Sequence, residues 1–295
     1  MIVVLLNPAS GVTATQDRSA RVAQLFEAAG ADAQIVELRA GVQTREAVRS
    51  AIAQGASAVV AAGGDGTVSS VASFLVGSET PLGVLPLGTL NHFARDAGIP
   101  NDLAAAVGVV VAAHVVSVDV GEVNGHTFIN NSSIGVYPDI VIEREKLRQQ
   151  GYRKWTAFAV ATARILRRYR GLVVRLATAA TAVGARTTFL FVGNNVYETE
   201  GLNLGGRARL DGGKLAAYLA PRVHTRDLPK LLALALAGRA RALHRLESFI
   251  TDELHVHTPG RRRLRVAFDG EVTVMTRPLH YRIRPRSLRV IVPAR

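Results

Sequence analysis

The chain has 295 residues, 48% of them hydrophobic and 20% charged, which is enough apolar material for two globular domains and excludes a disordered protein. The absence of cysteine excludes disulfides, thiolate metal sites and a cysteine nucleophile. The net charge of +13 indicates an anionic partner: a nucleotide, a nucleic acid or an acidic membrane surface. Aromatic residues make up only 5%, which argues against a nucleic-acid groove with stacking side chains, so no nucleic acid is expected.

The apolar segment at the start of the chain, Ile2–Leu6, is too short for a signal peptide and has no basic flank, so we interpret it as a buried strand. Nowhere does the sequence reach the roughly 18–20 uninterrupted apolar residues that a transmembrane helix needs. We therefore expect a cytoplasmic protein that at most contacts the inner face of a membrane peripherally.

Up to about Val120, short β-branched segments alternate with longer amphipathic ones, which is typical of βαβ units that build a parallel sheet with helices on both faces. The predicted strands are Ile2–Leu6, Ala33–Leu38, Ala58–Ala62 and Leu82–Pro86. The predicted helices are Arg18–Ala29, Thr44–Gln54, Thr67–Leu75 and Leu103–Ala113. We expect an α/β domain over residues 1–120, with ligands bound at the carboxyl ends of its strands.

After Val120 the pattern changes to strands separated by turn residues, which predicts an antiparallel β-rich domain over residues 121–280. The predicted strands are Thr127–Asn131, Leu172–Ala177, Thr187–Val192, Leu215–Leu219, His255–Thr258, Leu264–Phe268 and Leu288–Val292. Two inserted helical segments, Ile140–Arg170 and Leu228–Leu246, combine basic residues with apolar anchors. This combination is typical of helices at a membrane surface, and equally of helices packed on a domain with solvated arginines.

The motif Gly63-Gly64-Asp65-Gly66-Thr67 follows a predicted strand and begins a predicted helix. Glycines allow a phosphate to approach the backbone N–H groups, and the helix N-terminus favours negative charge. A carboxylate between them can hold magnesium through water or orient a nucleophile. The same residues also fit a plain helix start capped by Thr67.

Two further loops follow predicted strands and carry phosphate-binding residue types. The first contains Asn7, Ser10 and Gly11, and the second contains Gly88, Thr89 and Asn91. Each alone is ordinary loop chemistry. Because the carboxyl ends of parallel strands share one edge, we expect all three loops to converge there.

A pair of carboxylates, Asp269 and Glu271, stands late in the chain on either side of Gly270. They follow the predicted strand Leu264–Phe268. Such a pair can bind a metal or accept a hydroxyl proton, and Asp-Gly equally favours a simple hairpin turn.

In this order the motifs resemble the diacylglycerol kinase catalytic-domain family, which includes bacterial soluble lipid kinases, sphingosine kinases and ceramide kinases. The motifs are Asn-Pro-x-Ser-Gly, Gly-Gly-Asp-Gly-Thr, Pro-Leu-Gly-Thr-x-Asn and Asp-Gly-Glu, with Asn131–Gly135 and Val192–Asn194 between them. The ordered set spans nearly the whole chain. Gly-Gly-Asp-Gly alone is less specific, because NAD kinases and phosphofructokinases are similar there.

The resemblance implies a three-layer α/β nucleotide-binding domain and a β-rich, sandwich-like lipid-substrate domain, with residues 281–295 returning to the first. It implies transfer of the γ-phosphoryl group of ATP to the hydroxyl of a diacylglycerol-like or long-chain-base lipid. Mg²⁺ or another divalent cation would bridge the phosphates. The residues that would hold the nucleotide are Asn7, Ser10, Gly11, Gly63, Gly64, Asp65, Gly66, Thr67, Gly88, Thr89 and Asn91.

The resemblance also implies roles for the acidic residues. Glu271 is the candidate general base, with Asp269 beside it, and Asp65 is the rival. Asp65 and Asp211 are the candidate metal ligands.

Three acidic positions of the family are changed. His92 stands where the family commonly has aspartate, and Asp96 is a candidate replacement one helical turn later. In the segment that resembles the family's Leu-Asp-Asp-Gly-x-Leu-Asp, Asp211 keeps the first aspartate, and Gly212 and Ala216 replace the other two.

Two alternatives stay open. One is a kinase for a small metabolite such as NAD. The other, motivated by the three changed positions, is a catalytically weak lipid- or nucleotide-binding module.

Overall fold

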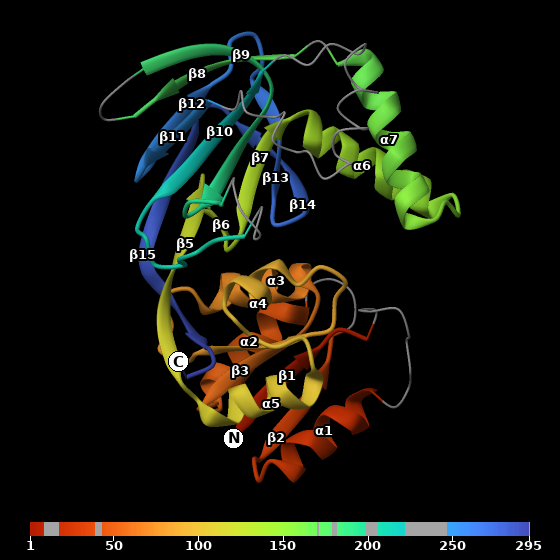
Figure 1. Ribbon diagram of the computed structural model, residues 1–295, viewed down its shortest axis with the longest axis vertical. Helices are drawn as coiled ribbons and strands as arrows, with labels where there is room; N and C mark the ends of the chain where they lie inside the picture. Colours follow the sequence, from red (N-terminus) through yellow and green to blue (C-terminus); the bar gives the residue numbers. More distant parts are fainter. Residues whose placement is uncertain are drawn as a thin grey trace.

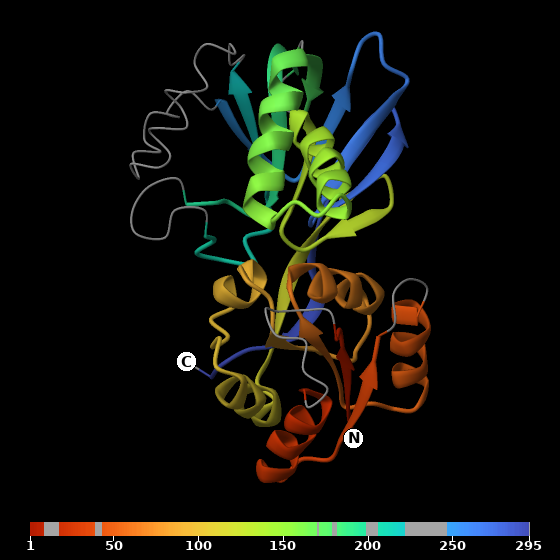
Figure 2. The ribbon, with the colours of Figure 1, turned by 90° about the vertical axis from the view of Figure 1, so that its right-hand side faces the viewer.

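The computed structural model describes residues 1–8, 18–38, 43–169, 171–178, 182–198, 206–221 and 247–294. Two halves are stacked along the long axis of the molecule, an α/β half and a β-rich half (Figure 1). Both chain termini lie in the α/β half (Figures 1 and 2). The predicted fold class is confirmed.

The α/β half contains four parallel strands in the order β2-β1-β3-β4, and their bounds are β1 Ile2–Leu6, β2 Ala33–Glu37, β3 Ala58–Gly63 and β4 Leu82–Pro86. The strands β3 and β4 are buried along their whole length. Such continuous apolar strands are typical of a parallel sheet covered on both faces. The four strands agree with the sequence prediction to within one residue at each end.

Helices cover both faces of this sheet and have the bounds α1 Arg18–Ala28, α2 Gln43–Ala53, α3 Asp65–Leu75, α4 His92–Asp96 and α5 Leu103–Ala112. Helix α1 contacts α5, and α2 contacts α3. Val22 and Phe26 of α1 and Val48 and Ala51 of α2 are buried in the same core as the strands. These spacings of four and three residues place each pair on one helix face, as the amphipathic pattern predicts.

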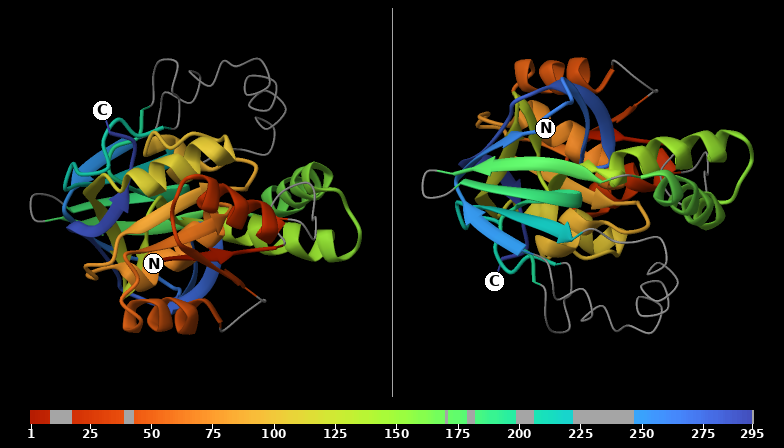
Figure 3. Two further views of the ribbon diagram at one scale, coloured as in Figure 1. Left: turned by 90° about the horizontal axis from the view of Figure 1, so that it is seen from below. Right: turned by 90° about the horizontal axis from the view of Figure 1, so that it is seen from above.

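The β-rich half is antiparallel, and its strands cross one another in a sandwich-like arrangement (Figure 3). Their bounds are β6 His126–Phe128, β7 Asn131–Gly135, β8 Leu172–Ala177, β9 Ala182–Asn194, β10 Leu215–Pro221, β11 Glu247–Thr251, β12 Glu253–His257, β13 Arg263–Phe268 and β14 Glu271–Thr276. Alternating residues of β8 and β12 are buried, as expected for strands with one solvated face.

Two long antiparallel strands, β5 (Val115–Val123) and β15 (Leu279–Ile291), run through both halves. At one end β15 pairs with β12, and at the other Val290 pairs with Leu82 of β4. The same two strands contribute side chains to the cores of both halves. The sequence prediction missed β5 and recognised only the last residues of β15.

The predicted helical segment Ile140–Arg170 is a hairpin of two helices, α6 (Val136–Gln149) and α7 (Lys154–Arg168). The break falls at Gly151, whose φ of 89° belongs to the left-handed region that ends many helices. The hairpin projects from the β-rich half and has a small core of its own (Figure 3). The other predicted helical segment, Leu228–Leu246, lies outside the described residues. The next described element, β11, begins at Glu247.

Among the residues described, no helix combines the length and the apolarity that crossing a bilayer requires.

The prediction of one strand over Thr127–Asn131 is wrong. The chain forms β6 and β7 instead, separated at Ile129 and Asn130. The N–H groups of both residues donate to the Asp269 carboxylate, and the Ile129 carbonyl accepts from the side chains of Asn194 and Arg207. Within the described residues, only the Asn130 carbonyl of this pair accepts a backbone N–H, that of Asn194 at the end of β9. A strand cannot continue where its hydrogen-bonding groups are taken in this way.

We predict that Leu288→Ala lowers the free energy of unfolding by about 2–5 kcal/mol, because Leu288 is fully buried where β15 enters the α/β half. Urea denaturation followed by circular dichroism measures the change. Val274→Ala is the control, since Val274 is 58% exposed and should change stability by less than about 0.5 kcal/mol. Equal effects of the two variants would contradict the prediction.

Candidate functional site

The turn between β3 and α3 forms the centre of the candidate site. Gly64 is the N-cap of α3 in an extended conformation, and Asp65 is the first helical residue, two positions before the predicted start. No side chain caps this helix. Because the first N–H groups of a helix lack partners within it, the turn is suited to bind an anion such as a phosphate.

The loop after β4 lies directly against this turn. A side chain at Gly88 would place its Cβ 2.6 Å from the Cα of Gly64, so the two backbones approach each other only because both residues are glycine. A side chain at Gly63 would overlap that of Thr67. At Gly66 the outward side is open, which leaves room for a ligand.

Amide side chains hold these loops in place. The Asn7 Nδ2 donates to Thr67 Oγ1 at 3.0 Å, which joins the end of β1 to α3. The Asn91 amide bonds to both the N–H and the C=O of Gly88, at 3.0 and 3.1 Å. Asn91 has a φ of 49°, so its side chain and its left-handed backbone together shape the loop.

The structure therefore brings together Asn7, Gly63, Gly64, Asp65, Thr67, Gly88 and Asn91 at one sheet edge. Thr89 is exposed on the same loop as Gly88. The predicted nucleotide-binding residues Ser10 and Gly11 lie outside the described residues.

One oxygen of the Asp65 carboxylate accepts the backbone N–H of Phe93 at 3.2 Å, which ties the start of α3 to α4. Within the described part of the chain, no hydrogen bond reaches the second oxygen. That oxygen is available to a water molecule or a cation. His92, the residue that replaces the family's aspartate, is exposed beside Asp65 at the start of α4.

Asp269 and Gly270 form the two-residue turn between β13 and β14, with φ values of 46° and 89°. Both conformations are those that an Asp-Gly hairpin turn requires. The Asp269 carboxylate faces inward and accepts the N–H groups of Ile129, Asn130 and Asn131 at 2.7, 2.9 and 3.0 Å. Burial raises the pKa of this carboxyl, and its hydrogen bonds oppose that shift.

The Asp269 carboxylate also accepts a hydrogen bond from the Ser69 hydroxyl of α3. Ser69 is four residues after Asp65, so both lie on the same face of that helix. Glu271 is two residues beyond Asp269, at the exposed start of β14. The Ser69 contact therefore brings the late acidic motif to the face of α3 that carries Asp65.

Arg207 is a residue of this region that sequence reasoning missed. Its guanidinium is fully buried, forms an ion pair with Asp96 of α4 at 2.8 Å and donates to the carbonyl of Ile129 at 2.6 Å. It also donates to the Asn130 side chain at 2.8 Å. Nothing local in the sequence distinguishes Arg207 from the exposed Arg209, because burial and partners are set by distant segments.

The Asp96 carboxylate forms an ion pair with Arg207. Its partner is thus a guanidinium group, and not a metal ion bound at the turn between β3 and α3. The expectation that Asp96 replaces the missing acidic residue at His92 is therefore not supported by its contacts.

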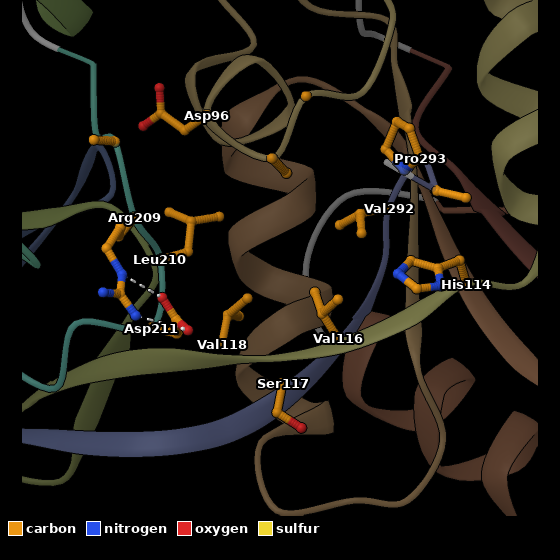
Figure 4. Close-up of a pocket in the computed structure, with 14 residues that line it drawn as sticks. Asp96, His114, Val116, Ser117, Val118, Arg209, Leu210, Asp211, Val292 and Pro293 are labelled. Atoms are coloured by element: carbon orange, nitrogen blue, oxygen red, sulfur yellow. Dashed lines mark hydrogen bonds and ion pairs between the residues drawn. The ribbon is translucent and has the colours of Figure 1, made fainter.

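Asp211 is paired with Arg209, whose guanidinium nitrogens lie 3.1 and 3.4 Å from its two carboxylate oxygens. This hydrogen bond from Arg209 lowers the pKa of the Asp211 carboxyl. Both residues line a pocket of about 760 Å³ beside β5, together with His114 and Val292 (Figure 4). The lining of this pocket includes none of the predicted phosphate-binding residues, so the structure does not bring Asp211 together with them.

Comparison with known proteins covers both halves of the chain. The family model of the diacylglycerol kinase catalytic domain matches residues 1–123. The model of the YegS C-terminal NAD kinase beta sandwich-like domain matches residues 135–292.

Curated relatives of the chain include proteins named diacylglycerol kinase. A diacylglycerol kinase of Bacillus subtilis (strain 168) is 35% identical over 130 residues, which is 43% of each chain. A diacylglycerol kinase of Staphylococcus aureus (strain JH9) is 28% identical over 204 residues, or 67% of this chain and 63% of the relative. The matched segments thus span less than two thirds of these curated relatives.

The fold is shared with a crystal structure of a diacylglycerol kinase from Bacillus anthracis str. Sterne. The TM-score is 0.74 at 21% sequence identity, covering 99% of this chain and 96% of the other. The structural match covers nearly the whole chain, so it includes how the two halves are arranged as well as the segments that the two family models match. The chain belongs to the diacylglycerol kinase family, with that family's catalytic domain followed by a YegS-type C-terminal domain.

Proposed function

We propose that the protein is an ATP-dependent lipid kinase that transfers the γ-phosphoryl group to the hydroxyl of a diacylglycerol-like or long-chain-base lipid. The observation that carries this proposal is the contact between Ser69 and Asp269, because it sets Glu271 on the side of α3 that carries Asp65. A phosphate-binding turn and an acidic motif from the other half would then act on the same pair of substrates. Family membership supports the reaction class.

The residues present fit a nucleotide and its divalent cation. The uncapped N-terminus of α3, the open side of Gly66 and the close contact of Gly64 with Gly88 would accommodate phosphate oxygens. The unpaired oxygen of Asp65 would hold Mg²⁺ directly or through water. When bound, the cation would neutralise the charge on the phosphates. Asp211 remains a second proposed ligand, and it would first have to release Arg209.

In the proposed reaction the lipid hydroxyl oxygen forms a bond to the γ-phosphorus while the bond from that phosphorus to the ADP oxygen breaks. Glu271 accepts the hydroxyl proton as that bond forms, and Asp65 is the alternative base. Positioning of the two substrates supplies most of the rate enhancement. We propose that Asp269 acts by holding Glu271 in place, since its own oxygens are engaged by four donors.

The α6–α7 hairpin supports access to a lipid. Trp155 is 71% exposed, and Tyr152 and Phe158 are exposed near it at the start of α7. The hairpin also carries exposed basic residues, of which Lys146, Arg148 and Arg153 are close to this end, whereas Arg164, Arg167 and Arg168 lie further along α7. Apolar anchors beside positive charge suit the surface of an anionic bilayer. We propose that the hairpin contacts the membrane peripherally and that the protein works at its cytoplasmic face.

We predict that Asp65→Asn and Glu271→Gln each lower kcat/KM for lipid phosphorylation by at least about 100-fold, because each removes a group that acts on the reacting atoms. The measurement is transfer of labelled phosphate from ATP to diacylglycerol, sphingosine or ceramide in mixed micelles, with NAD as a soluble acceptor. Glu79→Gln is the control, because Glu79 is exposed and, among the described residues, its ion pair is with Arg289, away from the candidate site. Transfer to NAD alone, or to no acceptor, would contradict the proposal.

Asp269→Asn should lower the free energy of unfolding by about 1–3 kcal/mol, because an amide nitrogen in place of one oxygen leaves backbone N–H groups without an acceptor. Glu271→Gln should change it by less than about 0.5 kcal/mol, since Glu271 is exposed. Guanidinium denaturation of both variants tests the contrast. Equal stability of the two would show that Asp269 is not the anchor we propose.

The double variant Trp155→Ala/Phe158→Ala should bind vesicles of equal parts phosphatidylglycerol and phosphatidylcholine at least about 10-fold more weakly, since each ring contributes roughly 1.5–3 kcal/mol when buried. Co-sedimentation measures the binding. Ile250→Ala removes a side chain that is 61% exposed on β11 and should leave it unchanged. If both variants bind like the unmodified protein, the hairpin is not the contact surface.

A further inference from the structure

Three side chains with metal-ligating atoms gather on the outer face of the β-rich half, apart from the candidate kinase site. Glu253 and His255 belong to β12 and are separated by one residue, so they lie on the same face of that strand. His280 of β15 is directly opposite His255 in the antiparallel register. The three ligand atoms all lie within 4.8 Å of one another.

The two imidazoles converge on one carboxylate oxygen. The Nε2 of His255 lies 3.4 Å from Glu253 Oε1, and the Nε2 of His280 contacts the same oxygen. The two rings are stacked in parallel with their centres 4.4 Å apart. Two ligands of a tetrahedral zinc ion, each about 2.0–2.1 Å from it, are separated by roughly 3.3 Å. The 3.4 Å between His255 Nε2 and Glu253 Oε1 matches this separation. Because the two rings are parallel and His280 touches the carboxylate, an ion shared by all three residues would require the His280 ring to turn.

The arginine opposite Glu253 in the strand register pairs with a different carboxylate. Arg282 is opposite Glu253 in the register, which would make it the expected ion-pair partner. Its guanidinium instead contacts Glu122 of β5 at 2.7 Å. Glu122 is also 3.5 Å from Arg284. Among the described residues, no arginine forms an ion pair with Glu253.

We propose that Glu253, His255 and His280 form a binding site for a divalent transition metal ion of the zinc type. Two imidazoles and a carboxylate are ligands that zinc accepts readily, whereas magnesium prefers oxygen alone. The residues are partly exposed, so water would complete the coordination. The ion would link β12 to β15, and β15 continues from there into the α/β half.

Binding requires that the Nε2 lone pairs of the two imidazoles are available to the ion, because a metal ion takes the place of a proton on a ligating nitrogen.

The test is a titration of the full chain, first treated with a chelator and then freed of it, with zinc alone against a zinc-sensitive dye. We expect the unmodified protein to compete for zinc, and His255→Gln, His280→Gln and Glu253→Gln each to weaken this competition at least about 10-fold. His257→Gln is the matched control. His257 is exposed two residues further along the same face of β12, but its register partner is Arg175 rather than a histidine.

Thermal unfolding provides a second measurement that does not depend on kinase activity. Zinc should raise the midpoint for the unmodified protein and for His257→Gln, and should not raise it for His280→Gln, because a ligand stabilises only the state that binds it. A millimolar excess of magnesium should not displace the zinc. The proposal is overturned if the unmodified protein does not compete for zinc, or if His257→Gln loses as much affinity as His280→Gln.

Discussion

The backbone of Ile129–Asn131 is held between a buried carboxylate and a buried guanidinium, and the relative placement of the two halves depends on this contact. Asp269 accepts the three N–H groups of the segment, while Arg207 donates to the carbonyl of Ile129. Each charged group then reaches the α/β half: Asp269 through Ser69 of α3, and Arg207 through Asp96 of α4. The helices α3 and α4, which follow the loops after β3 and β4, are thereby attached to the other half.

Buried charges are costly unless their hydrogen-bonding capacity is used, and here it is used. Arg207 has partners in Asp96, Ile129, Asn130 and Asn194, and its guanidinium also lies over the Tyr197 ring. Losing one member would leave the other charge uncompensated in a dry region, which costs more than an exposed pair contributes. We therefore expect this arrangement to fix how the two halves sit against each other more than to add net stability.

The sequence was most informative where local pattern and structure coincide. Continuous apolar segments such as Ile2–Leu6 identified the parallel strands, because both faces of that sheet are covered. Strand β5 was missed because Asp119 and Glu122 resemble surface residues, although both are buried. Asp119 accepts the N–H groups of Gly213 and Arg286, and Glu122 pairs with Arg282. Partners so distant in sequence cannot be recognised from a local pattern.

The candidate site likewise contains residues whose placement followed from the sequence pattern and residues whose placement did not. The convergence of Asn7, Thr67 and Gly88 follows from the parallel sheet and was predicted. The inward direction of the Asp269 carboxylate was not predicted, because the N–H groups that donate to its oxygens belong to a segment about 140 residues away in the chain. The same holds for Arg207, whose role depends on four groups from three distant segments.

The pairing of β5 with β15 has a mechanical consequence. Two hydrogen-bonded strands resist bending within their plane more than a single peptide linker does, so we expect the halves to move little in that direction. The register shift between Arg284 and Leu288 is where the pair is least regular, and Asp119 accepts the N–H of Arg286 there. We therefore expect any bending between the halves to occur perpendicular to the plane of the two strands and at this irregular position.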